Sequence, residues 1–272
     1  MIFLYISLGI IAFAFLLYLF LVFPSGRKKK TAEFFEGRRL YAHRGLHGNG
    51  VPENSLAAFE LACKAGYGIE FDVHITADGE LSVFHDDTLA RMCGVEGKTE
   101  DKTLEQLRAL KLAGTEEHIP SLREVLDLID GRVPLVIEIK GTKISDTRVC
   151  ELTAQMLDTY KGVFCIESFN PIYVRWWKKH RKSTVRGQLS SDMKKGNPNM
   201  SNVVNFFLTN LLLSFLARPD FIAYDVSEKH RFSFRFARAL GGYPVAWTIR
   251  TEDDKKASDG DFKAIIFENI RP

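Results

Sequence analysis

The most constraining feature of this sequence is a regular alternation of short apolar strands and amphipathic helices after residue 40. Eight segments have the composition of buried strands running in one direction: 40–43, 69–74, 134–139, 163–168, 184–189, 220–225, 244–249 and 263–268. Parallel strands need crossover helices, and the length fits the roughly 250 residues of an α/β barrel. The pattern therefore predicts a (β/α)₈ barrel of the TIM type over residues 40–272. An open doubly wound sheet is the alternative, but it usually has fewer strands and a glycine-rich phosphate loop after the first.

The amino terminus differs in character from the rest of the chain. Residues 2–23 form an apolar run of 22 residues without a charge. As a helix this run would be about 33 Å long, enough to cross a hydrocarbon core of roughly 30 Å. A secretory signal peptide is the alternative, but no basic residue precedes the run and no small-residue cleavage site follows it. We expect residues 1–24 to be a transmembrane anchor.

Basic residues follow the apolar run at once. Residues 27–30 are Arg-Lys-Lys-Lys, and Arg38 and Arg39 follow, so residues 1–39 carry a net charge of +4 in a chain of +3. We expect residues 25–39 to be a basic juxtamembrane linker in contact with anionic headgroups. The positive-inside rule then predicts a single-pass membrane protein with its amino terminus outside and its barrel in the cytoplasm. The barrel segment has no basic excess, which argues against a nucleic-acid partner.

A predicted hairpin carries the first candidate ligands. Residues 69–75 alternate apolar side chains with Glu70, Asp72 and His74, and a Thr-Ala-Asp-Gly turn then returns the chain to His85. Two carboxylates two residues apart on a strand lie about 7 Å apart on one face. In a pocket with little water they repel each other unless a proton or a hard divalent cation lies between them. The alternative is a half-exposed strand with a solvated polar face.

Further polar residues are predicted at the carboxyl ends of the strands, where barrel enzymes place their active sites. Carboxylates for a cation, two imidazoles and two cationic groups together suit the cleavage of a phosphodiester. Taken singly, each has an ordinary alternative, such as a strand-end histidine bonded to the backbone, an ion pair at the rim or a core tryptophan. The set comprises His43, Arg44, Glu70, Asp72, His85, Glu138, Lys140 and Trp247.

The motifs that contain these residues resemble those of the glycerophosphodiester phosphodiesterase family. They follow in that family's order: HRG at 43–45, PENS at 52–55, ExD at 70–72, TADG at 76–79, HDD at 85–87 and ExK at 138–140. Three further segments are similar to other landmarks of the family: IPSL at 119–122, ESF at 167–169 and AWT at 246–248. Two places depart from the family's pattern. Residues 91–94 replace a turn that contains threonine, and Glu268 stands where an aspartate is more usual.

The resemblance implies a metal-dependent barrel enzyme. Glu70, Asp72 and Glu138 would hold a divalent cation, Mg²⁺ or Ca²⁺. His43 and His85 would be the acid/base pair, and which of them is the base is left open. The reaction would convert a glycerophosphodiester into glycerol 3-phosphate and an alcohol.

The resemblance also implies residues that bind the substrate. Arg44 and Lys140 would contact the phosphate, and Glu53 would orient a substrate hydroxyl or the site itself. Phe169 and Trp247 would line the glycerol pocket.

Two other functions remain as alternatives. The predicted anchor suggests a lysophospholipase D that acts on membrane lysolipids. A non-catalytic barrel that binds lipid headgroups is the other alternative. Residues 203–217 are apolar on nearly all sides and are predicted to form one helix, either a deeply packed outer helix or one that dips into the membrane surface.

Overall fold

The computed structural model describes residues 1–196 and 200–272, and it confirms the predicted barrel. Eight parallel strands pair in the order β1-β9-β8-β7-β6-β5-β4-β2, and β1 pairs with β2 to close the barrel. The eight are β1 (Leu40–His43), β2 (Gly68–Ile75), β4 (Leu135–Ile139), β5 (Phe164–Ser168), β6 (Val185–Ser190), β7 (Phe221–Asp225), β8 (Tyr243–Ile249) and β9 (Ala264–Phe267).

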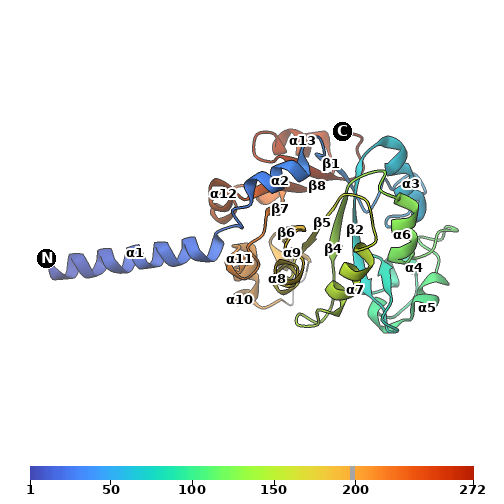
Figure 1. Ribbon diagram of the computed structural model, residues 1–272, viewed down its shortest axis with the longest axis horizontal. Helices are drawn as coiled ribbons and strands as arrows, with labels where there is room; N and C mark the ends of the chain where they lie inside the picture. The colour runs from blue at the N-terminus through green and yellow to red at the C-terminus, as the bar shows by residue number, and fades with distance from the viewer. Residues whose placement is uncertain (197–199) are drawn as a thin grey trace.

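Helices surround the barrel (Figure 1). The main outer ones are α3 (Leu56–Ala65), α6 (Leu122–Ile129), α7 (Arg148–Leu157), α8 (Pro171–His180), α10 (Asn202–Thr209), α11 (Ser214–Ala217), α12 (Phe232–Ala239) and α13 (Glu252–Ser258). The short strand β3 (Leu81–Val83) returns antiparallel to β2, as the hairpin predicts. Shorter helical segments occupy the loops: α4 (Ala90–Cys93), η1 (Thr99–Asp101), α5 (Leu104–Arg108), α9 (Met193–Gly196) and η2 (Val226–Glu228).

Local sequence sets the ends of these helices. The Ser55 side chain accepts a hydrogen bond from the Ala58 amide at the start of α3. Ser121 and Glu124 form the reciprocal capping box that their spacing predicts at the start of α6. Because each cap satisfies amides that a helix leaves unpaired, it fixes where the helix begins.

The segment treated as a linker, residues 25–39, contains a helix. α2 (Lys28–Phe35) buries Phe35 at the amino-terminal end of the barrel, where its ring stacks on Tyr243 at 4.6 Å between centroids and meets the Phe221 ring edge-on at 5.4 Å. The basic run predicts an exposed segment. The phenylalanines of α2, however, close the end of the barrel opposite the carboxyl ends of the strands.

The prediction of a single helix over residues 203–217 is wrong. The structure breaks it into α10 and α11, because Leu211 takes a left-handed conformation with φ of 57°. The turn buries Leu211 and Leu212, and Leu211 belongs to a core cluster with Ile222 of β7. Tertiary packing thus outweighs local helix preference here.

The apolar run forms one helix, α1 (Ile2–Val22), that projects from the barrel (Figure 1). It is long and apolar enough to cross a membrane, and Val22 is its one buried residue. Length and composition are also compatible with a signal sequence.

Candidate active site

Strand register brings three carboxylates to one level of the barrel. Asp72 of β2 pairs with Glu138 of β4, and Glu138 pairs with Glu167 of β5. Glu70 lies two residues before Asp72 and pairs with His43 of β1. Because neighbouring strands lie about 4.8 Å apart, this register brings side chains from different strands close together.

A cluster of carboxylate oxygens results. Oxygens of Glu70, Asp72 and Glu138 all lie within 4.8 Å of one another, and all three residues are buried. Burial, followed by repulsion from neighbouring carboxylates, raises the pKa of Glu70 well above its usual value. Burial likewise raises the pKa of Glu138 to about 7, although Lys140 opposes the change. The site therefore concentrates more negative charge than the protein groups neutralise.

Two cationic side chains lie beside this cluster. Lys140 Nζ is 2.9 Å from Glu138 Oε1 and 3.3 Å from Asp72 Oδ1. Arg44 Nε lies 3.6 Å from Asp72 Oδ2, and the Arg44 backbone amide donates to Glu70 Oε2 at 3.1 Å. Burial alone would raise the pKa of Asp72, but Lys140, His85 and Arg44 lower it below its usual range.

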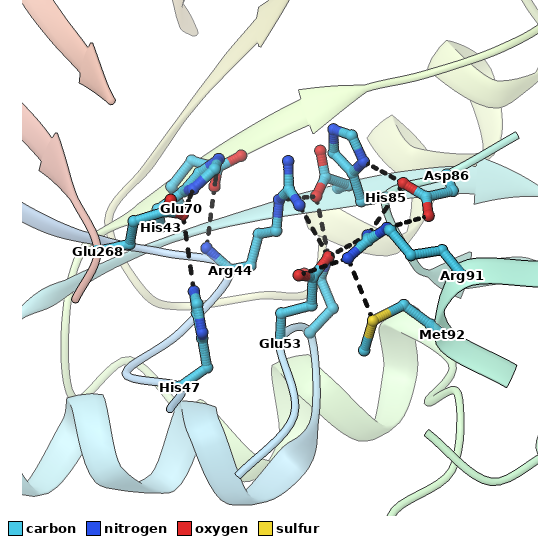
Figure 2. Close-up of polar contacts among 12 residues, drawn as sticks. His43, Arg44, His47, Glu53, Glu70, His85, Asp86, Arg91, Met92 and Glu268 are labelled. Carbon is cyan, nitrogen blue, oxygen red and sulfur yellow. Dashed lines mark hydrogen bonds and ion pairs between the residues drawn. The ribbon is translucent and has the colours of Figure 1, made fainter. Parts of the chain in front are cut away.

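His43 is held from the opposite end of the chain. Its Nδ1 is 2.6 Å from Oε2 of Glu268, the residue directly after β9 (Figure 2). Arg250 Nε is 2.5 Å from Glu268 Oε1. The other ring nitrogen, Nε2, lies 3.9 Å from Glu70 Oε2. Burial lowers the pKa of His43 to about 4, against the opposing effect of the hydrogen bond to Glu268.

His85 has a similar set of partners on a loop. Its Nδ1 is 2.6 Å from Asp86 Oδ1, and Arg91 Nε is 2.6 Å from Asp86 Oδ2 (Figure 2). Burial lowers the pKa of His85 too, although the charge of Asp72 opposes it. In both histidines a carboxylate occupies Nδ1, which leaves Nε2 free for another partner.

Glu53 lies between two arginines. Its Oε1 accepts from Arg44 Nη1 at 2.8 Å and lies 2.6 Å from Arg91 Nη2. Figure 2 shows Glu53 between the side chains of Arg44 and Arg91. Glu53 therefore orients Arg44 directly.

One cavity joins these groups at the carboxyl ends of the strands. It has a volume of about 70 Å³, and the Phe169 and Trp247 rings meet edge-on beside it with centroids 5.4 Å apart. Residues that line it include His43, Arg44, Glu70, His85, Glu138, Glu167, Phe169 and Trp247. Asp72, Lys140 and Glu53 contact residues of this set, so the structure brings together all ten residues selected from the sequence.

Three carboxylates of this site have no role predicted from the sequence. Glu167 ends β5 at the level of Glu138, so the same strand-end reasoning could have found it. Asp86 follows His85 directly within a quoted motif. Glu268 was noted only as a departure at the rim, and its pairing with His43 requires the closed barrel.

Two other polar residues lie outside the site. His74 is fully buried, with Nδ1 3.5 Å from Glu100 Oε1. Asp225 caps the segment η2 by accepting from the Ser227 amide.

A closed parallel barrel whose carboxyl-terminal mouth gathers carboxylates, imidazoles and cationic groups has the arrangement in which α/β barrels hold their active sites. The model of the glycerophosphoryl diester phosphodiesterase family matches residues 43–271. The chain therefore belongs to this family, which is one of phosphoric diester hydrolases. The resemblance found in the sequence motifs is confirmed.

Individual relatives agree with the family match. A glycerophosphodiester phosphodiesterase of Caldanaerobacter subterraneus subsp. tengcongensis is 41% identical over 152 residues, which cover 52% of this chain and 61% of that protein. Human glycerophosphodiester phosphodiesterase 1 is 36% identical over 265 residues, which cover 85% of this chain and 78% of the human protein. The matched segment thus spans less than two thirds of the bacterial relative's length.

Solved structures share the fold. An Oleispira antarctica phosphodiesterase, solved in complex with the product sn-glycerol-3-phosphate, matches with a TM-score of 0.70 at 22% sequence identity. The match covers 86% of this chain and 94% of that one.

Proposed function

We propose that this chain is a metal-dependent phosphodiesterase that hydrolyses glycerophosphodiesters to glycerol 3-phosphate and an alcohol. The observation that carries the proposal is a single cavity lined by both histidines, by Glu70 and Glu138 and by Arg44. Membership of the family supports the reaction class. The product in the Oleispira antarctica structure supports glycerol 3-phosphate as one product here.

Glu70, Asp72 and Glu138 are the proposed ligands of the divalent cation. Their oxygens lie close enough to share one ion, and all three residues are buried. Oxygen ligands suit Mg²⁺ or Ca²⁺. When bound, the cation would stabilise negative charge on the phosphoryl group as a Lewis acid.

His43 and His85 are the proposed proton carriers. Because Glu268 and Asp86 occupy Nδ1 of each ring, Nε2 is the atom that would exchange a proton. One imidazole takes the proton from the nucleophile, and the other gives a proton to the leaving oxygen.

Arg44 and Lys140 are the proposed phosphate ligands, since both are partly buried cations beside the carboxylate cluster. Glu53 would act through Arg44 by fixing its guanidinium. Phe169 and Trp247 offer apolar ring surface to the carbon atoms of glycerol.

The proposal is tested with the full chain purified in detergent and incubated with glycerophosphocholine. We expect release of glycerol 3-phosphate, its loss with a chelator, and recovery on adding Mg²⁺ or Ca²⁺. Binding of glycerophosphocholine without turnover, in protein loaded with either cation, would instead support a headgroup-binding barrel.

A lysophospholipase D is the second candidate, because α1 is apolar and long enough to lie in the bilayer that holds such substrates. Turnover of lysophosphatidylcholine in vesicles, compared with that of glycerophosphocholine, separates the two. Failure to cleave the lysolipid, beside efficient cleavage of the deacylated compound, would exclude this candidate.

We also propose that residues 1–24 anchor the chain in one pass, with the barrel of residues 40–272 on the cytoplasmic side. The basic residues after α1 support this orientation. A membrane-impermeant thiol reagent applied to sealed cells would test it with a cysteine placed at exposed Lys29, which should react only after the cells are opened.

A further inference from the structure

Helix α10 has its polar and apolar faces reversed relative to an ordinary surface helix. Val203, Phe206 and Phe207 lie on one side of it, at i, i+3 and i+4, and expose 64%, 57% and 38% of their surface. A helix on a water-soluble protein turns such a stripe inward. Because the apolar stripe of α10 points outward, we infer that this face of the helix is covered by something other than water.

The inward face of α10 carries the polar residues Asn205 and Thr209. Thr209 Oγ1 donates to the Ser191 carbonyl at 2.8 Å, and Asn205 Nδ2 donates to Asp192 Oδ1 at 3.1 Å. These contacts hold the helix in one rotational position on the barrel. The exposure of the phenylalanines is therefore built into the fold.

The position of α1 indicates which environment covers this face. Tyr18 of α1 stacks on Phe232 of α12 at 5.9 Å between centroids, and Phe20 packs against Phe215 of α11 at 5.6 Å. Figure 1 shows α12, α11 and α10 along the side of the barrel from which α1 projects. A bilayer crossed by α1 would lie against this same side.

Charged groups at the junction fit the level of the lipid headgroups. The Arg218 guanidinium donates to the carbonyls of Phe20 and Phe23 at 2.8 and 2.7 Å and lies over the Phe20 ring. Arginine and tyrosine at the end of a spanning helix are typical of the membrane interface. Phe232, with 69% of its surface exposed beside Tyr18, lies at this level as well.

α10 also borders the catalytic mouth. Ser190, the last residue of β6, donates from Oγ to the Leu208 carbonyl at 2.9 Å. The exposed stripe is thus fixed to a strand end at the same rim as the candidate active site.

We propose that α10 is an interfacial helix whose Val203, Phe206 and Phe207 enter the same leaflet that surrounds the carboxyl end of α1, together with Phe232. This places the mouth of the barrel at the bilayer surface. The proposal rests on the proposed membrane insertion of α1 but not on the catalytic activity.

Tryptophan fluorescence of the full chain in vesicles tests the proposal. F206W is reconstituted in phosphatidylcholine and phosphatidylglycerol, with and without lipids brominated near the top of the acyl chains. The matched control is L61W, an exposed apolar position on α3 at the far side of the barrel. Because an interfacial helix buries its apolar face about 5–10 Å deep, we expect bromine to quench the added emission of F206W and not that of L61W.

Other outcomes contradict the proposal. Emission from F206W that bromine leaves unchanged would place α10 outside the bilayer. A blue shift that depends on the ratio of protein to lipid, without quenching, would assign the stripe to a second copy of the chain. Flotation of the vesicles after washing in alkaline carbonate tests separately whether α1 is inserted in the membrane. If F206W disturbs folding, V203W is used for the same quenching measurement.

Discussion

The two histidines of the candidate site have the same kinds of partner, a carboxylate backed by an arginine, but they are positioned by different parts of the fold. His43 ends strand β1, keeps 11% of its side chain exposed, and takes its carboxylate from Glu268, 225 residues away. His85 lies on a loop, keeps 31% exposed, and takes its carboxylate from the next residue, Asp86. The barrel wall therefore fixes His43, whereas a short loop orients His85 near solvent. One site thus combines a rigid imidazole with an accessible one, a division that suits two different proton transfers.

The largest expected effect is the removal of either imidazole. H43A and H85A should each lower kcat by about 10²–10⁴-fold, since each loses one proton transfer. Steady-state kinetics with glycerophosphocholine measures this, and circular dichroism checks the fold. H180A is the control, because His180 is an exposed residue at the end of α8. If H85A kept most of the activity while H43A lost it, only the rigid histidine would carry proton transfer.

The cation site allows a second test on the rigid side, because Glu70 lies next to His43. E70Q should lose affinity for Mg²⁺ or Ca²⁺ in calorimetric titration while keeping its fold. In the unsubstituted protein, cation at a hundred times its Kd should stabilise the fold by about 2.7 kcal/mol. E70Q should lose most of this gain and should be no less stable than the unsubstituted protein in chelator, because a buried, repelled charge has been removed. Unchanged titration curves would contradict the assignment of Glu70.

Substituting the carboxylate partner of each histidine should distinguish the roles of His43 and His85 through the pH dependence of kcat/KM. Glu268 and Asp86 both raise the pKa of their histidines, so E268Q should lower the pKa of His43 and D86N that of His85. A histidine that must be neutral sets the acidic limb of the kcat/KM profile, and one that must be protonated sets the alkaline limb.

We therefore expect each substitution to move a different limb toward lower pH, and the limb that moves identifies the base and the acid. Loss of such an orienting partner should also lower kcat, by roughly 10–100-fold on the scale known for partners of metal ligands. Movement of the same limb in both variants would contradict a division of roles.

The smallest effect is expected at the outermost members, Arg91 and Arg250. Both side chains are about half exposed, at 48% and 55%. R91A and R250A should each cost less than about 1 kcal/mol in urea unfolding, since exposed ion pairs contribute little. A larger loss for R91A alone would indicate that its second contact, with Glu53, also supports the loop of His85.

This comparison also explains what could be predicted from the sequence. The strands were predictable because most are short apolar runs with polar residues near the carboxyl end, as in β4, β5 and β7. The contact of Asp86 with His85 could be predicted because the two residues are adjacent in the sequence. The pairing of Glu268 with His43 was not, since it depends on β9 closing against β1. The aromatic closure by α2 and the break at Leu211 likewise depend on packing against distant residues, which a local pattern does not contain.

The join between α1 and the barrel has a mechanical consequence. Arg27 forms an ion pair with Asp220, and the Ser25 amide donates to the Pro219 carbonyl at 2.9 Å, only a few residues after α1 ends. Because the connection is short and these contacts fix it, α1 and the barrel should move together as one rigid unit. A spanning helix tilts to match the thickness of its bilayer. If α1 spans the bilayer as proposed, a change in bilayer thickness would change the tilt of α1 and with it the tilt of the barrel. The distance between the mouth of the barrel and the lipid surface would then depend on membrane thickness.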